Sequence, residues 1–320
     1  AQCTDERVNR VTPALFRTMP LPTYPEIRLA ITPFRRLARM LDEFEPDTIH
    51  IATEGTLGIA GRKYCVRRGI SFITSQHTRF PEYVHLRTRI PIDFGYAWLR
   101  RFHAPAARTL VRTATLRKEL DARGFDHLDV WPGAVDTMLF RPRGKDALDF
   151  PRPISLYMGR VAIEKGLPDF LDLDLPGTKV IIGDGPDLDK LRYHYADTRF
   201  LGAKFGEELA TLVSAADVFV FPSRTDTFGL VLLEAMACGI PVAAYPVPGP
   251  QDVLQDGVTG IMDENLRTAW EGALKLNPEE CRQFAADYSW TRSTDRFLDF
   301  QVRIRREADK QPARTVNVPD

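Results

Sequence analysis

The chain has 320 residues, of which 44% are hydrophobic and 27% are charged, and its 43 Lys and Arg are balanced by 43 Asp and Glu. This length predicts two domains of roughly 150 residues each, and the composition is that of a globular protein, not a disordered one. No stretch approaches the roughly 18 uncharged apolar residues of a membrane-spanning helix, which excludes that class.

Charge is distributed unevenly. Residues 1–145 carry 24 Lys and Arg against 15 Asp and Glu, whereas residues 146–320 carry 19 against 28. The basic excess is densest in residues 51–118, with 13 basic and 3 acidic side chains. Such a region can meet an anionic membrane surface or a phosphorylated ligand, or it can be a solvated helix face. Aromatic residues do not interleave with the arginines, so we expect no nucleic acid partner.

The four cysteines, Cys3, Cys65, Cys238 and Cys281, show no paired spacing. We therefore expect free thiols, with neither a zinc site nor a disulfide framework. The first residues lack the apolar segment of a signal peptide. These features favour a cytoplasmic location, with peripheral attachment to the inner face of the membrane left open.

The first half alternates predicted strands and helices, which indicates a parallel sheet. A short strand is expected within residues 7–16, and three prolines keep residues 20–25 extended. A helix begins at Pro33 and carries an apolar stripe to Phe44, which could be a membrane-surface face but is expected to face the core. Further strands are predicted at 48–52, 70–75, 109–113 and 128–131, and helices near 56–68, 93–106 and 115–123.

Polar side chains follow two of these strands. His77 comes directly after the strand at 70–75, with Arg79 and Glu82 close behind, and Glu54 follows the strand at 48–52. In open parallel sheets, ligands bind beyond the carboxyl ends of the strands. These residues, Glu54 included, therefore point to a ligand site in the first half.

The second half repeats the alternation after a connection at residues 131–145. We predict a first domain at 1–144, a second domain at 145–287, a terminal helix at 288–307 and a disordered tail at 308–320. The second half has predicted strands at 154–158, 178–182, 199–204, 218–221 and 241–245, and predicted helices at 206–215, 228–238, 266–275 and 278–287.

Two cations stand where the strand at 154–158 turns toward a helix. Arg160 and Lys165 are five residues apart, a spacing that can neutralise a diphosphate without a metal. The next turn, Gly183 to Pro186, lacks the spacing of a dinucleotide-binding fingerprint.

The densest signals lie in residues 217–250. The strand Val218–Phe221 leads through a polar loop into a helix predicted from Phe228 to Cys238, whose first amides suit hydroxyl or phosphate oxygens. Gly229 lets a ligand approach the backbone closely. Asp226 in the loop and Glu234 on the helix could hold one ligand at two points.

This segment resembles the donor-site signature of retaining GT-B glycosyltransferases of family 4. The matching order is an acid, seven residues, Glu234, and then Ala-Met-Ala-x-Gly-x-Pro-Val. The resemblance extends from residue 10 to about residue 300. It implies an α/β GT-B fold, in which two Rossmann-like domains face across a cleft and a C-terminal helix returns to the first domain.

The resemblance also implies roles for individual residues. Glu234 would hold the nucleotide ribose, while Asp226 and the amides after it would hold the transferred sugar. Arg160 and Lys165 would hold the diphosphate, and His77 would approach the donor sugar. The implied catalytic residues are His77, Arg160, Lys165 and Asp226; the nucleotide-sugar residues are Gly159, Arg160, Lys165, Gly183, Asp226, Thr227, Phe228, Gly229, Leu230 and Glu234; the acceptor-side residues are Glu54, Arg79 and Glu82.

The chain departs from the family pattern at three places. Asp226 stands where the family has Glu, and Pro132-Gly133-Ala134 replaces a basic residue and Gly before Val-Asp. The family's first strand and Gly-containing loop have no counterpart in this chain. Their absence predicts that the first sheet has an exposed edge. It also predicts that the sequence is a fragment of a longer gene.

The resemblance implies transfer of a hexose with retention, from a nucleotide sugar to a hydroxyl of a glycolipid or glycan. The group of bacterial GDP-mannose-dependent α-mannosyltransferases and glycolipid glycosyltransferases favours mannose from GDP-mannose. We expect no cofactor, no metal and no protein partner. Three alternatives remain: a UDP-sugar-dependent glycolipid synthase, a sugar-nucleotide epimerase, and a catalytically dead sugar-nucleotide-binding protein.

Overall fold

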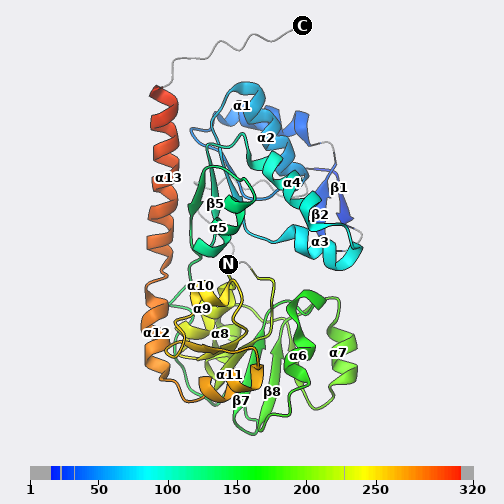
Figure 1. Cartoon of the computed structure of the whole chain (residues 1–320), viewed down its shortest axis with the longest axis vertical. Coiled ribbons are helices and arrows are strands. Elements are labelled where there is room, and N and C mark those ends of the chain that lie inside the picture. Colours follow the sequence, from blue (N-terminus) through cyan, green and yellow to red (C-terminus); the bar gives the residue numbers. More distant parts are fainter. Residues whose placement is uncertain (1–15, 22–23, 32, 227, 311–320) are drawn as a thin grey trace.

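The computed structural model describes residues 16–21, 24–31, 33–226 and 228–310. It has two lobes, each built on a parallel sheet, with the first half of the chain in one lobe and the second half in the other (Figure 1). The strand predicted within residues 7–16 lies almost entirely outside the described residues, so that prediction stays open.

The first sheet has four parallel strands in chain order, preceded by an antiparallel hairpin that the sequence patterns did not predict. The sheet strands are β3 (His50–Ile51), β4 (Ile73–Gln76), β5 (Arg108–Val111) and β6 (Leu128–Val130), and the hairpin strands are β1 (Thr18–Leu21) and β2 (Tyr24–Ala30). The helices are α1 (Phe34–Phe44), α2 (Thr56–Arg68), α3 (Phe80–Thr88), α4 (Ile92–His103) and α5 (Ala114–Ala122).

One expectation for this domain needs correction, because helix α3 lies in a segment in which no helix was predicted. Helix α1 forms where expected. Phe34, Ala38 and Leu41 on its apolar face are partly buried against the core, while Phe44 at its end is 67% exposed.

The second sheet has six parallel strands in the order β12-β11-β10-β7-β8-β9, which places its first strand near the centre. The strands are β7 (Ile154–Met158), β8 (Thr178–Ile182), β9 (Arg199–Gly202), β10 (Val218–Phe221), β11 (Val242–Ala244) and β12 (Gly260–Met262). The helices are the 3₁₀ turn η2 (Ile163–Lys165), α6 (Leu167–Leu171), α7 (Leu188–His194), α8 (Gly206–Ser214), α9 (Leu230–Ala237), α10 (Pro250–Val253), α11 (Leu266–Ala273) and α12 (Pro278–Ala286).

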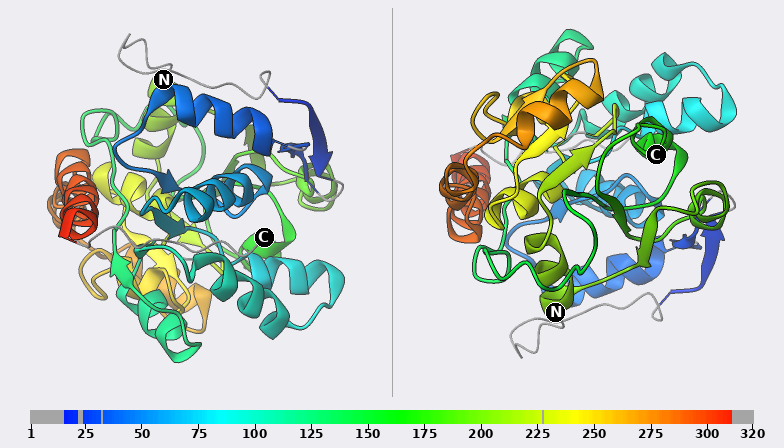
Figure 2. Two further views of the ribbon diagram at one scale, coloured as in Figure 1. Left: turned by 90° about the horizontal axis from the view of Figure 1, so that it is seen from above. Right: turned by 90° about the horizontal axis from the view of Figure 1, so that it is seen from below.

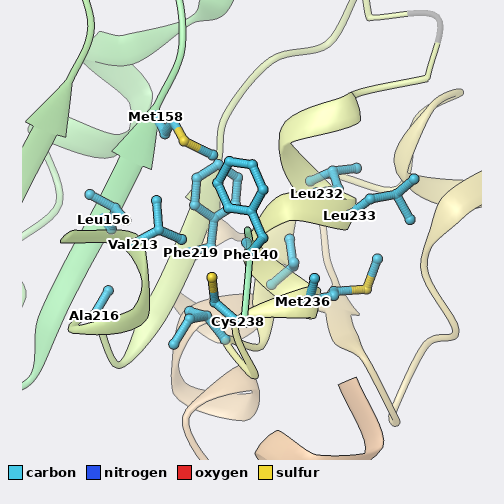
Figure 3. Close-up of a cluster of buried hydrophobic side chains, with 14 of the residues drawn as sticks. Phe140, Leu156, Met158, Val213, Ala216, Phe219, Leu232, Leu233, Met236 and Cys238 are labelled. Atoms are coloured by element: carbon cyan, nitrogen blue, oxygen red, sulfur yellow. The ribbon is translucent and has the colours of Figure 1, made fainter. Parts of the chain in front are cut away.

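Both faces of the second sheet are buried, as is typical of parallel sheets. Side chains alternate along each strand, so Phe219 of β10 joins the core on one face while Val218 and Val220 join the core on the other. Phe140, from the connection between the domains, packs into the first of these cores beside α9 (Figure 3). This packing fixes the connection to the second domain.

The last helix, α13 (Trp290–Lys310), returns to the first domain, as the GT-B prediction requires. It runs along one side of the molecule in all three views (Figures 1 and 2). Phe300 is buried against Ile73 and Leu110 of the first sheet, and the Trp131 indole N–H donates to the Ser293 carbonyl at 3.0 Å. The helix continues to Lys310, three residues into the segment predicted to be a disordered tail.

Cys65, Cys238 and Cys281 are buried free thiols, and Cys3 lies outside the described residues. Within the part of the chain that the structure describes, no helix is both long and apolar enough to cross a bilayer. The same residues include no group of three or more His, Cys, Asp or Glu placed to hold a metal ion.

Candidate active site

The predicted donor-side residues gather where the strand order of the second sheet reverses. Strands β7 and β10 are neighbours, and the chain leaves them toward opposite edges of the sheet. Such a reversal opens a crevice at the carboxyl ends of the two strands. Gly159 and Arg160 follow β7, and the loop from Pro222 to Asp226 follows β10. The two loops singled out in the sequence therefore meet at this crevice.

The floor of the crevice is made of closely packed backbone. The Gly159 amide donates to the Ile182 carbonyl at 3.0 Å, and a Cβ added to Gly183 would lie 1.8 Å from the Gly159 carbonyl oxygen. Gly159 and Gly183 have φ angles of +150° and +149°, which side-chain-bearing residues rarely adopt. Glycine at both positions is thus required by the fold, and it leaves room for a ligand to approach the backbone.

Lys165 and Asp226 form an ion pair across the crevice. Lys165 Nζ lies 2.6 Å from Asp226 Oδ1, and the two side chains are 17% and 16% exposed. The hydroxyls of Ser223 and Thr225 are 3.4 and 3.3 Å from the Glu164 carbonyl, to which they donate, so η2 is tied to the loop after β10. The second carboxylate oxygen of Asp226 is buried and has no hydrogen-bond partner among the described residues. A sugar hydroxyl could satisfy that acceptor.

Helix α9 begins at Leu230, two residues later than predicted. Gly229 precedes it with φ +79°, a left-handed conformation that ends the loop sharply. Phe228 is buried, and a Cβ added to Gly133 would lie 2.7 Å from its ring and 2.4 Å from Leu230. Phe228 and Leu230 therefore pack on the connection between the domains, at the place where the chain departs from the family pattern. Thr227 lies outside the described residues.

Glu234 stands one turn into α9, where burial raises the pKa of its carboxyl to about 7. The shift has one cause, the loss of water around the charged form. A ligand that donates hydrogen bonds to the carboxylate would offset that loss, which suits the ribose hydroxyls assigned to it by resemblance.

His77 follows β4, with its ring centroid 6.0 Å from that of Trp131. Burial, the charge of Arg112 and that of His50 lower the pKa of His77 to about 4. The guanidinium of Arg112 lies over the same indole ring, 4.6 Å from its centroid. His77 is therefore neutral at pH 7, and it can exchange hydrogen bonds with a sugar without adding charge.

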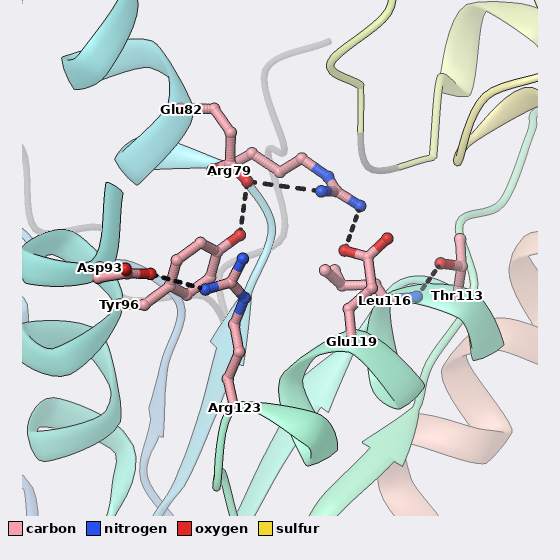
Figure 4. Close-up of polar contacts among 8 residues, drawn as sticks. All are labelled: Arg79, Glu82, Asp93, Tyr96, Thr113, Leu116, Glu119 and Arg123. Carbon is pink, nitrogen blue, oxygen red and sulfur yellow. Dashed lines mark hydrogen bonds and ion pairs between the residues drawn. The ribbon is translucent and has the colours of Figure 1, made fainter. Parts of the chain in front are cut away.

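Arg79 and Glu82 belong to a polar network inside the first domain (Figure 4). Arg79 lies 2.7 Å from Glu119 and 3.5 Å from Glu82, while the Tyr96 hydroxyl donates to Glu82 at 2.6 Å. The network joins α3, α4 and α5. Arg79 and Glu82 thus have structural partners, and their role toward an acceptor stays a prediction.

Glu54 is 7% exposed, with its carboxylate 3.3 Å from Nε2 of the equally buried His103. The other ring nitrogen of His103 is hydrogen-bonded to the Thr74 hydroxyl at 2.8 Å. Glu54 and Thr56 also line a pocket of the first domain. The carboxylate is therefore held inside the domain, at the wall of that pocket.

Comparison with known proteins decides the family. Residues 3–139 match the model described as Glycosyltransferase Family 4, and residues 142–269 match Glycosyl transferases group 1. The chain is 32% identical over 266 residues to the GDP-mannose-dependent alpha-mannosyltransferase of Mycobacterium tuberculosis, covering 80% of this chain and 68% of that protein. The chain is a family 4 glycosyltransferase.

Other relatives of this glycosyltransferase differ in their named sugar. It is 31% identical to a sulfoquinovosyl transferase of Arabidopsis thaliana, covering 77% of this chain and 52% of that protein. Among solved structures, sucrose-phosphate synthase from Thermosynechococcus elongatus superposes with a TM-score of 0.72 at 22% identity, over 94% of this chain and 86% of that one. HepE of Anabaena in complex with UDP-glucose superposes with a TM-score of 0.70 at 15% identity, over 90% of this chain and 85% of that one. These structures establish the GT-B fold.

The glycosyltransferase has one crevice residue that the sequence patterns did not single out. Tyr83 of α3 lies close to the side chains of Thr225 and Asp226, so it reaches from the first domain to the loop after β10. Burial, followed by the charge of Asp226, raises the pKa of its phenol. In the sequence, the only indication of a role for Tyr83 was its position one residue after Glu82, because the helix that orients its side chain had not been predicted.

Proposed function

We propose that this protein transfers a hexose, favoured to be mannose from GDP-mannose, to a hydroxyl of a glycolipid or glycan acceptor with retention of configuration. The observation that carries the proposal is the meeting of Lys165 and Asp226 at the switch point of the second sheet. The Lys165 ammonium can bind phosphate, and the Asp226 carboxylate can accept hydrogen bonds from a sugar. The names of the mannosyltransferase relatives favour the donor.

In this proposal the ion pair opens when the donor binds. Lys165 Nζ turns to the diphosphate together with Arg160, while Asp226 accepts hydrogen bonds from sugar hydroxyls. Negative charge grows on the departing diphosphate during transfer, and fixed cations stabilise such charge by several kcal/mol. Retention follows from substitution on the face that the diphosphate leaves, with the departing phosphate accepting the proton of the acceptor hydroxyl. No side chain becomes covalently attached to the sugar.

Lys165→Ala tests the assignment of charge stabilisation. We expect turnover to fall by at least about a hundredfold, because a fixed cation of this kind contributes roughly 3 kcal/mol. Lys190→Ala on the exposed side of α7 is the matched control and should retain its activity. Turnover near the wild-type value in Lys165→Ala would remove Lys165 from the mechanism.

The donor base is tested by the thermal stabilisation of the protein with GDP, UDP and ADP. A ligand that binds only the folded state raises the melting temperature by mass action. We expect GDP to give the largest shift and Glu234→Ala to lose it. A larger shift with UDP would favour a UDP-sugar-dependent glycolipid synthase. Binding without turnover would identify a catalytically dead sugar-nucleotide-binding protein, and release of nucleotide without transfer would favour an epimerase.

A further inference from the structure

Helix α10 of the second domain contacts the start of helix α5 in the first domain. The Thr115 amide donates to Oδ1 of Asp252 at 3.2 Å, although the two residues are 137 apart in the chain. Figure 1 shows α10 at the side of the second domain that faces α5. The carboxylate of Asp252 therefore joins the two domains.

On the side of the first domain, the contact completes the cap of α5. The Thr113 hydroxyl accepts the Leu116 amide at 3.1 Å (Figure 4). The amides of the first helical turn have no partners within the helix, and the partial positive charge there is complemented by a carboxylate. Helix α5 thus takes one acceptor from its own domain and a second, charged acceptor, Asp252, from the other domain.

On the side of the second domain, Asp252 belongs to the segment that supports the donor site. Its amide donates to the Gly249 carbonyl at 3.1 Å. A Cβ added to Gly249 would lie 2.9 Å from the Asp226 carbonyl oxygen, so the two backbone segments are in close contact. The side chain of Asp226 is paired with Lys165 at 2.6 Å. A short series of contacts therefore connects α5 to the ion pair in the crevice.

The Asp252 carboxylate is only half satisfied in this position. Its Oδ2 atom is buried and has no hydrogen-bond partner among the described residues. A buried carboxylate oxygen without a donor has lost the hydrogen bonds of water, which offsets much of what the bond to Thr115 contributes. Separation of the domains would return both oxygens to water. The contact therefore favours the closed arrangement by a small margin, so the domains can part and meet again.

We propose that Asp252 is a positioning residue for sugar transfer, because its bond to the Thr115 amide holds the first domain in place over the loop after β10. It acts through the placement of the domains and not through contact with the reacting atoms. His77 belongs to the first domain and Asp226 to the second, so both can meet one sugar only while the domains are held together. The proposal rests on the proposed function.

Two substitutions remove the contact from opposite sides. Asp252→Ala removes the acceptor, and Thr115→Pro removes the amide donor. Proline is tolerated in the first turn of a helix, and Pro81 is the second residue of α3 as Thr115 is of α5. Asp256→Ala is the matched control, because the Asp256 carboxylate accepts the Met262 amide at 2.9 Å within the second domain.

Two properties are measured: the radius of gyration by small-angle X-ray scattering, and the release of GDP from GDP-mannose with water as the acceptor. We expect Asp252→Ala and Thr115→Pro each to enlarge the radius and to slow release about tenfold, as the loss of one hydrogen bond to a charged group would. The double variant should be no slower than either single variant, because both changes remove the same contact. Asp252→Asn keeps an acceptor oxygen and should recover most of the rate, and the control should behave as wild type does.

A wild-type radius and rate in both Asp252→Ala and Thr115→Pro would overturn the proposal. Further slowing in the double variant would also overturn it, since the two residues would then act separately. The absence of GDP release from wild-type protein would instead refute the proposed donor. The radius of gyration needs no donor, so it would still decide whether Asp252 holds the domains together.

Discussion

Replacement of Glu234 by Gln removes a carboxyl whose pKa is raised from 4.5 to about 7 by burial. Below pH 4.5 the carboxyl is protonated in both the folded and the unfolded chain, and it has little effect on stability. As the pH rises toward 7 the unfolded chain releases the proton first, so the stability of the wild type falls. Each pKa unit corresponds to about 1.4 kcal/mol, which gives a full cost of roughly 3 kcal/mol above pH 7. Gln cannot ionise and avoids this cost.

We therefore expect the stability difference between Glu234→Gln and wild type to shift in favour of the variant by roughly 2–3 kcal/mol between pH 5 and pH 8. The measurement is denaturant unfolding at both pH values, followed by fluorescence of the second domain, in which Trp270 is buried. Glu271→Gln on the exposed side of α11 is the control, because its surface pair with Arg267 contributes at most about 1 kcal/mol. A difference between variant and wild type that is the same at both pH values would refute the burial of this carboxyl.

Three further outcomes are expected. Gly183→Ala should destabilise the second domain by about 3 kcal/mol or more and abolish nucleotide-dependent stabilisation, because its Cβ would overlap the Gly159 carbonyl; unfolding midpoints and thermal shifts measure both. Tyr83→Phe should raise the KM for the donor several-fold while changing the unfolding free energy by at most about 1 kcal/mol, because its phenol lies beside Thr225 and Asp226 at the crevice; an unchanged KM would contradict its place there. Phe300→Ala should cost about 3–5 kcal/mol in the first domain, whereas the half-exposed Leu298→Ala should cost far less, as measured by denaturant unfolding.

The second domain could be predicted well because its signals are local. Strands β7, β8 and β10 are rich in apolar residues, and each is followed by Gly or Pro at the turn, so their places were evident from the pattern alone. The position of Glu234 on the helix after β10 followed from the same pattern. The resemblance to family 4 then supplied the GT-B fold, which the comparisons confirm.

Helix α3 could not be predicted because its stability comes from a neighbour. Its second residue is a proline and its apolar residues are few, but it packs so closely on α4 that a Cβ added to Gly95 would lie 2.8 Å from Pro81. Tertiary contacts of this kind override local propensity. Missing α3 also meant missing Tyr83, whose position at the crevice depends on that helix.

The sequence by itself determined the two-domain α/β organisation and the chemical types at the site, because strand and helix periodicity, glycine turns and the order of charged residues are properties of the linear chain. Tertiary structure decided which of these residues meet. It placed Lys165 2.6 Å from Asp226, brought Tyr83 across to Thr225 and buried Glu54 beside His103. Those contacts join residues far apart in the chain, and the closing of the sheets and the docking of the domains create them.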